Sequence, residues 1–323
     1  MREEHQLITG LHHVTACVAT AQEDIDFFTR VIGQRVIKQT VLYDGTAPIY
    51  HLYYANADAE IGTVMTTFPY RQDGRKGRRG TGQVATTAYS VGEDALDFWA
   101  SHLTRYGVRH NGIETRFGKN LIHFAHPAGL EFEVIGDNRD TRGGWTTDDI
   151  NDTNSVKGFH NVVMSVRDVQ AQHDYFTDGL GFQKTNQEGD YTEYSIGEGG
   201  PGKTIILRHD AYAEQGSWTF GEGTIHHVAF AVENDEKQRQ LKHWLEGLGY
   251  TDVSEQKDRN YFHSVYCRSP GGILTEFATC DIGFNTDESP EKLGQTLQLP
   301  QWLESRRAEI VAPLEPITVP PTR

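Results

Sequence analysis

The hexapeptide Gly10-Leu11-His12-His13-Val14-Thr15 recurs with small changes as Thr224-Ile225-His226-His227-Val228-Ala229. In each copy a pair of histidines precedes alternating apolar residues, a pattern typical of a half-buried β-strand. A third segment, Pro270–Glu276, places the carboxylate of Glu276 inside another predicted strand. Two imidazoles and one carboxylate, each held on a strand, form the facial triad that suits non-haem Fe(II) and leaves coordination positions open.

Four segments around these copies repeat one plan, in which a strand is followed by a helix, a glycine and three further strands. They cover residues 8–69, 83–136, 157–210 and 224–280. The predicted helices are Asp24–Ile32, Glu93–Tyr106, Val169–Leu180 and Asp235–Leu248, and a glycine beyond the helix, such as Gly33, fits a left-handed cap. Because a βαβββ unit leaves one sheet face exposed, it must pair with another unit. We therefore expect an α+β fold of four βαβββ modules, paired into two cupped mixed β-sheets with helices outside.

The modules suggest a domain organisation. An N-terminal domain over residues 1–150 would hold the first two modules, and a C-terminal domain over residues 151–280 the other two. Residues 281–323 depart from the repeat and form a C-terminal extension, in which Gln301–Ile310 is expected to be helical and the Pro-rich end extended. The Arg- and Gly-rich linker 70–82 is expected to be a solvated connector between the first two modules.

The repeat indicates which modules carry the metal site. Five residues before the valine that ends the first strand, the four modules have His13, Thr86, Asn161 and His227 in turn. The second module keeps Glu133 where the fourth has Glu276, six residues after a proline in both cases. One complete donor set results, namely His13, His227 and Glu276. The other set, Thr86, Asn161 and Glu133, is expected to be a relic without metal.

Strand alternation separates the two histidines of each pair. The apolar residues that alternate with His13 and His227 should pack on the helices, so these two histidines point to the open face of the sheet. His12 and His226 are then expected on the helix side or in a second layer around the metal. A single strand histidine is more often a core residue than a ligand, and the remaining histidines, His51 among them, are expected to be incidental.

Composition excludes several classes of protein. The 323 residues are 37% hydrophobic and 11% aromatic, which is typical of a globular chain long enough for two domains. A net charge of −15 argues against nucleic-acid and anionic-membrane partners. Three cysteines without CxxC spacing argue against a disulfide framework or zinc cluster, and favour the cytoplasm. Neither a signal peptide nor a membrane-spanning apolar run is expected.

The expected site is open. Zinc and nickel isomerases built from such repeats typically take a fourth ligand from the last strand of the partner module. Here that strand, residues 62–68, contains no Glu, Gln or His. Three protein ligands with an open face fit Fe(II) activation of O₂, with Mn(II) as the less favoured alternative.

With these features the chain resembles the vicinal oxygen chelate superfamily of glyoxalases and dioxygenases. More narrowly it resembles the hydroquinone ring-cleaving dioxygenases, and best the 2,6-dichlorohydroquinone 1,2-dioxygenases. The resemblance covers nearly all of residues 8–300. It rests on LHHVT (11–15), YDGTAPIYHLYYA (43–55), GTVMTTFP (62–69), QGSWT (215–219), GTIHHVAFAV (223–232), DRNYFHSVYCRSPGG (258–272) and the strand of Glu276.

The resemblance implies an Fe(II)-dependent extradiol-type dioxygenase that adds both atoms of O₂ to a substituted hydroquinone, chlorinated ones included. The first and fourth modules would form the active cup, with His13, His227 and Glu276 as ligands. Residues in the second layer or in contact with substrate would be His12, Thr15, His226, Arg259 and Tyr266. In that group the Tyr266 phenol suits proton exchange, and the Arg259 guanidinium suits an oxyanion.

Two other functions stay open. A glyoxalase-like metal-dependent lyase or isomerase is disfavoured by the missing fourth ligand. A non-catalytic small-molecule-binding protein of the same fold should have lost the metal set, which is intact here. The expected partners are a small aromatic substrate and O₂, and a homo-oligomer is compatible with the sequence.

Overall fold

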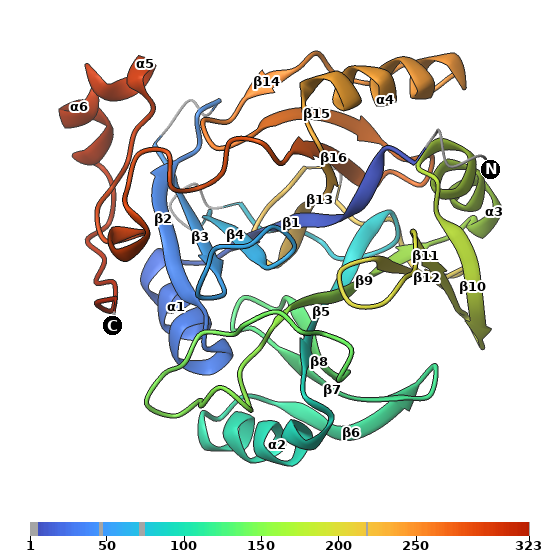
Figure 1. Cartoon of the computed structure of the whole chain (residues 1–323), viewed down its shortest axis with the longest axis horizontal. Coiled ribbons are helices and arrows are strands. Elements are labelled where there is room, and N and C mark those ends of the chain that lie inside the picture. The colour runs from blue at the N-terminus through green and yellow to red at the C-terminus, as the bar shows by residue number, and fades with distance from the viewer. Residues whose placement is uncertain (1–5, 45–47, 71–74, 218, 323) are drawn as a thin grey trace.

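The computed structural model describes residues 6–44, 48–70, 75–217 and 219–322, and these form two eight-stranded, curled mixed sheets with few helices outside them (Figure 1). The first sheet has the order β14-β15-β16-β13-β1-β4-β3-β2, and the second the order β10-β11-β12-β9-β5-β8-β7-β6. Each sheet therefore joins two modules, the first with the fourth and the second with the third. The predicted fold is confirmed, and each sheet takes one module from each half of the chain.

The strands follow the repeat. Those of the first sheet are β1 (Ile8–Val18), β2 (Arg35–Val41), β3 (Tyr50–Ala55), β4 (Val64–Pro69), β13 (Thr224–Val232), β14 (Lys257–Asp258), β15 (His263–Arg268) and β16 (Leu274–Thr279). Those of the second are β5 (Gln83–Val91), β6 (His110–Arg116), β7 (Lys119–Ala125), β8 (Glu131–Gly136), β9 (Gly158–Val166), β10 (Gln183–Glu188), β11 (Tyr191–Ser195) and β12 (Thr204–His209).

The four predicted helices are present, with three differences in detail. They are α1 (Ala21–Asp26), α2 (Leu96–Arg105), α3 (Val169–Asp174) and α4 (Asp235–Gly247). The first begins three residues earlier than expected, and both α1 and α3 continue as π-helical segments, η2 (Phe27–Ile32) and η5 (Tyr175–Gly179). A 3₁₀ turn, η4 (Glu93–Ala95), opens α2. Gly33 ends the first helix with φ +74°, as its left-handed cap position requires.

Apolar strand residues pack against these helices. Val14, Ala16 and Val18 of β1 are fully buried, as are Val228 and Phe230 of β13, and all belong to the main core cluster. These residues alternate along their strands, so the opposite face of each strand is left to form the inside of the cup. In the described part of the chain, no helix has the length and apolar character needed to cross a membrane.

The C-terminal extension covers the edge of the first sheet. It contains η6 (Pro290–Lys292), α5 (Gln301–Glu304) and α6 (Arg307–Val311), so the expected single helix is two short ones. The backbone N–H of Gln298 donates to the backbone carbonyl of Gln39 in β2, at 2.8 Å between N and O. Fully buried Lys38 of the same strand forms ion pairs with Asp287 and Glu288. These contacts protect an edge that would otherwise be open to pairing.

The basic linker also makes defined contacts in its described part. Residues 71–74 lie outside the described residues. Arg79 forms an ion pair with Glu131 at 2.8 Å, and Lys76 and Thr81 bridge in parallel to Glu222 and Gln215. The linker therefore ties the second module to the segment that precedes β13.

Candidate metal centre and substrate cavity

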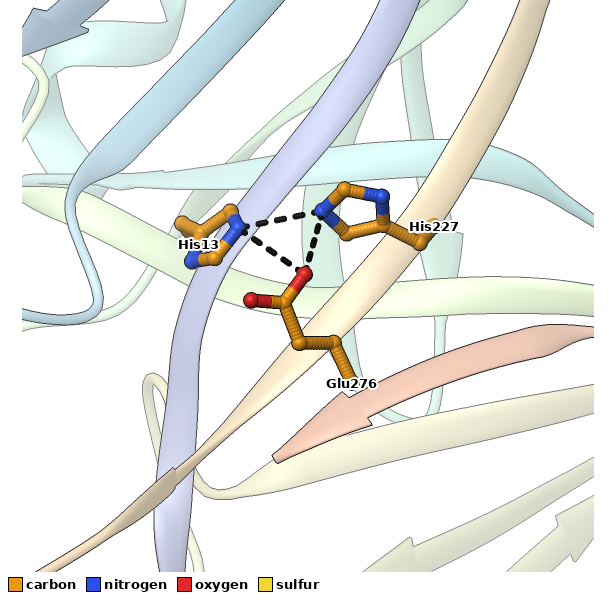
Figure 2. A group of neighbouring side chains, drawn as sticks. All are labelled: His13, His227 and Glu276. Atoms are coloured by element: carbon orange, nitrogen blue, oxygen red, sulfur yellow. Dashed lines mark hydrogen bonds and ion pairs between the residues drawn. The ribbon is translucent and has the colours of Figure 1, made fainter. Parts of the chain in front are cut away.

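Three side chains from three neighbouring strands converge inside the first cup. His13 lies on β1, His227 on β13 and Glu276 on β16, and all three are buried (Figure 2). The distance is 3.1 Å between the two Nε2 atoms, 2.8 Å from His227 Nε2 to Glu276 Oε2 and 3.6 Å from His13 Nε2 to Oε2. Among the described residues this is the one group of three or more His, Cys, Asp or Glu that could hold a metal ion.

The spacing and the free atoms of this triad fit a metal ion. Cis ligands with bonds of about 2.1 Å lie about 3 Å from one another, close to the distances found here. Glu276 Oε2 is buried and has no hydrogen-bond partner among the described residues, while Ser264 Oγ donates to the other oxygen, Oε1. Such an orphaned buried anion is costly unless a cation neutralises it.

The neighbouring histidines set the protonation of the two ligand candidates. His12 Nε2 lies 3.2 Å from the Thr279 carbonyl, which can only accept, so His12 must donate there. His12 Nδ1 then accepts from His13 Nδ1 at 2.9 Å, which leaves a lone pair on His13 Nε2. Burial, with His13 beside it, lowers the pKa of His12 to about 3, so the ring stays neutral.

The second pair repeats this arrangement. His226 Nδ1 and His227 Nδ1 are 2.8 Å apart, and burial lowers the pKa of both rings. If the His227 nitrogen donates, its Nε2 keeps the lone pair that faces Glu276. The outer ring, His226, stacks on Phe220 with ring centroids 3.8 Å apart. Such outer hydrogen bonds fix the orientation and tautomer of a metal-binding imidazole.

Two β-bulges explain why consecutive histidines reach the same place. Pairing between β1 and β13 passes from Leu11↔Phe230 to His13↔Ala229, so His12 is an extra residue on β1. On β13 the extra residue is His226, between the pairs Thr15↔His227 and Ala16↔Ile225. A bulge interrupts strict alternation. Both outer histidines therefore lie beside the inner ones, and not simply on the opposite face.

A cavity of about 300 Å³ opens beside the triad. Its lining comes from strands and loops of the first and fourth modules: His13, Leu42, Tyr43, Asp44, His51, Tyr53, Phe68, His226, His227, Lys257, Arg259, Phe262, Tyr266, Leu274 and Glu276. Aromatic rings dominate the wall, and a few polar groups converge within it, as in sites for small ligands. A larger groove of about 730 Å³ lies by α1 and the C-terminal end and contains none of the triad.

Arg259 and Tyr266 form one polar corner of this cavity. Tyr266 pairs with Glu276 across β15 and β16, and its ring centroid lies 5.8 Å from that of His227. Arg259 Nε donates to the Tyr266 hydroxyl at 3.2 Å, and its Nη1 lies 2.8 Å from Asp44 Oδ2. Burial, with Glu276 nearby, raises the pKa of Tyr266, so the phenol keeps its proton. Arg259 is therefore part of the cavity wall, with a side chain only 16% exposed.

Thr15, the last of the predicted site residues, lies behind the wall. Its Oγ1 is 2.7 Å from Thr66 Oγ1, and the latter is 2.9 Å from His51 Nε2. His51 and Tyr53 line the cavity, although the sequence indicated no role for either. Their positions, two apart on β3, place both side chains on one face, and this spacing was the only available signal.

In the second cup an arginine side chain is bound to the equivalent glutamate. Glu133 accepts two hydrogen bonds from Arg116, at 2.9 Å to Oε1 and 2.5 Å to Oε2. Arg116 precedes Glu133 by 17 residues, as Arg259 precedes Glu276. Asn161, which replaces a ligand histidine in the repeat, bonds to His160 Nδ1 at 2.8 Å. In the second cup the Arg116 guanidinium therefore balances the charge of Glu133. In the first cup the equivalent carboxylate, Glu276, faces two imidazoles instead.

Comparison with known proteins agrees with this architecture. The model of the glyoxalase/bleomycin resistance protein/dioxygenase superfamily matches residues 10–134 and 158–277. Chlorohydroquinone/hydroquinone 1,2-dioxygenase of Sphingobium indicum is 37% identical over 324 residues, which cover 99% of this chain and 100% of that protein. MhqO of Bacillus subtilis, provisionally named a ring-cleaving dioxygenase, is 35% identical over 310 residues, with 96% and 97% of the two chains covered.

Comparison with solved structures leads to the same superfamily fold. A Bacillus subtilis protein with a provisional dioxygenase assignment superposes with a TM-score of 0.91 at 34% identity, covering 98% of this chain and 99% of that one. Glyoxalase I of Zea mays, with a TM-score of 0.62 and 13% identity over 86% and 95% of the chains, shares the fold. The chain therefore belongs to the glyoxalase/bleomycin resistance protein/dioxygenase superfamily, and its full-length relatives place it among the ring-cleaving dioxygenases.

Proposed function

We propose that this protein is an Fe(II)-dependent ring-cleaving dioxygenase of the extradiol type, which uses O₂ to open the ring of a substituted hydroquinone, chlorinated hydroquinones included. The observation that carries the proposal is the buried convergence of two histidine Nε2 atoms and one glutamate Oε2 beside a cavity lined mainly by aromatic rings. The name of the Sphingobium indicum relative supports the substrate class.

Each part of the triad contributes something that iron requires. With His12 and His226 accepting at Nδ1, the inner imidazoles keep their Nε2 lone pairs free, and Glu276 supplies a negative charge. When bound by these residues, iron(II) supplies the electron path between substrate and O₂ and favours ionisation of a substrate hydroxyl. No fourth ligand of the His, Cys, Asp or Glu type joins the triad in the described chain, which leaves room for both reactants. Mn(II) is the alternative metal for this donor set.

The cavity suits a ring that carries its hydroxyls at opposite ends. A hydroquinone can bring only one oxygen to the triad, so other groups must hold the rest of the ring. Tyr266 stands next to Glu276, keeps its proton and can donate it to a substrate oxygen. Arg259 supports the phenol by a hydrogen bond and supplies a positive charge for an oxyanion. Ring faces are provided by the aromatic lining, in which Phe262 packs 5.0 Å from the His13 ring.

Metal loading tests the triad directly. His13→Ala, His227→Ala and Glu276→Ala should each fold, as judged by circular dichroism, and lose both iron retention after anaerobic Fe(II) loading and O₂ uptake with hydroquinones. Asn161→Ala, at the position matching His13 in the other cup, is the control and should keep both. Near-normal iron content in any of the three variants would remove that residue from the ligand set.

The rates with different substrates test whether hydroquinones are the substrate class. Substituted hydroquinones should support faster O₂-dependent ring cleavage than catechol, followed with an oxygen electrode and by the absorbance of the opened product. Rapid turnover of catechols together with no reaction of any hydroquinone would refute the substrate class and leave the metal site standing.

A further inference from the structure

A chain of four hydrogen-bonding side chains runs along the wall of the cavity that β3 and β4 form. It begins with Thr15 Oγ1 and Thr66 Oγ1, which are 2.7 Å apart. Thr66 Oγ1 is 2.9 Å from His51 Nε2, and His51 Nδ1 is 3.1 Å from the Tyr53 hydroxyl. Hydroxyl groups and a neutral imidazole can each donate and accept, so the chain is continuous in either direction.

The position of this chain sets it apart from Tyr266 and Arg259. Tyr53 pairs with Thr66 across β3 and β4, and Thr66 pairs with Thr15 across β4 and β1. The strand β3 therefore lies two strands from His13, about 10 Å away at the usual strand spacing. Tyr266, in contrast, is on the strand next to Glu276. Both pairs line the same cavity, Tyr53 and His51 from β3, and Tyr266 and Arg259 from β15 and the residue that follows β14.

Aromatic rings pack around the inner end of this chain. Tyr53 is 1% exposed, and the His51 ring is packed between Tyr53 and Phe68, with centroids 4.3 and 4.2 Å away. The nearest acceptor for a proton that leaves the Tyr53 hydroxyl is His51 Nδ1, 3.1 Å away. Asp44, the carboxylate at the rim, is already paired with Arg259 and Lys257. The imidazole of His51 can take up a proton on this wall, and because burial lowers its pKa well below the usual value, the imidazolium readily gives that proton back.

A substrate with para hydroxyls requires a proton acceptor at the end of the ring that does not reach the triad. If one oxygen reaches the triad, the second hydroxyl lies at the other end of the ring, toward the β3 wall. Loss of its proton would raise electron density in the ring as the ring reacts with O₂. Resting on the proposed function, we propose that Tyr53 and His51 are a proton relay that accepts the proton of the second substrate hydroxyl and returns it to the ring-opened product.

The protons balance over one turnover. The O–H bond of the second substrate hydroxyl breaks, its electron pair stays on the substrate oxygen, and the proton bonds to the Tyr53 oxygen. The former Tyr53 proton bonds to His51 Nδ1, which gives an imidazolium that still donates from Nε2 to Thr66. Both transfers reverse when the opened product takes its proton back. The relay ends as it began, and O₂ is the only oxidant.

Three variants and one control test the relay. Glutamine at His51 can hydrogen-bond to both hydroxyls but cannot carry a proton, whereas phenylalanine can do neither. We expect His51→Gln, His51→Phe and Tyr53→Phe each to lower kcat for hydroquinones about 10²-fold or more, with KM within a few-fold and iron content unchanged. The double variant Tyr53→Phe/His51→Gln should be no slower than the slower single one, because residues that act as a unit are not additive.

The control is His173→Gln, because His173 Nδ1 makes the same contact with a tyrosine hydroxyl, that of Tyr194, at 3.1 Å outside the cavity. It should keep the wild-type kcat. Wild-type kcat in His51→Gln would show that His51 only positions its neighbours, and iron loss in that variant would show a role in metal retention. Either result overturns the relay. A wild-type enzyme that consumes no O₂ with any hydroquinone overturns the proposed function and the relay together.

Discussion

Replacement of Glu133 by glutamine removes a charge from the second cup and none from the triad. Glu133 is 3% exposed and receives two hydrogen bonds from Arg116, with His123 Nδ1 3.7 Å from its Oε1. Glu133 does not line the cavity beside His13. The substitution should therefore lower stability while it leaves iron binding and hydroquinone turnover per folded molecule unchanged.

The magnitude follows from the pKa of this carboxyl. Burial raises the pKa, but His123 and Arg116 more than offset this and lower it from 4.5 to about 2. Because the folded pKa is below the unfolded one, the contribution to stability is complete above pH 4.5 and is lost as the pH falls through about 2. At about 1.4 kcal/mol per pH unit, it amounts to about 3 kcal/mol at pH 7 and about 1 kcal/mol at pH 3.

Thermal unfolding of the metal-free protein measures this contribution without interference from iron release. A loss of about 3 kcal/mol in a chain of 323 residues lowers the unfolding midpoint by about 4 °C at pH 7, and the difference should shrink to about 2 °C at pH 3. Glu131→Gln is the matched control on the same strand. Its side chain is 31% exposed and pairs with Arg79, so the substitution should cost less than about 1 kcal/mol.

Two results would refute this reasoning. An equal drop in the midpoint at pH 7 and pH 3 would show that the buried ion pair is not the source of the stability. Loss of iron or of hydroquinone turnover in a folded Glu133→Gln protein would show that the second cup takes part in catalysis, contrary to the repeat argument.

Three further predictions concern the first cup and the extension. Tyr266→Phe should lower kcat for hydroquinones about 10²- to 10⁴-fold in steady-state assays, with iron retained; unchanged rates would exclude proton exchange by the phenol. His12→Ala should weaken iron binding about 10- to 100-fold in a chelator competition, and equal affinity would contradict its orienting role. Lys38→Met leaves two carboxylates without their buried partner and should cost about 3 kcal/mol; an unchanged unfolding midpoint would show that this ion pair does not anchor the extension.

Local sequence patterns were sufficient to predict the modular plan and to propose the triad. Strand and helix periodicities are local properties, so four repeats could be found without any knowledge of contacts. Register within the repeat then separated His13 and His227 from Asn161 and Thr86. The same register made Glu133 the equivalent of Glu276, and Glu133 was set aside because no ligand histidine accompanies it. These inferences compare equivalent positions along the repeat, so they require no knowledge of how far apart the residues lie in space.

The connections among the polar groups around the triad depend on contacts that form only in the folded protein. Bulges at His12 and His226 arise from the pairing of strands more than 200 residues apart, and this pairing leaves no periodic trace in either strand. The cavity wall likewise brings His51 next to Thr66 and Thr15, although each side chain alone resembles an ordinary strand residue. A hydrogen-bond chain depends on atoms within about 3 Å of one another, and only the packing of the sheet sets such distances.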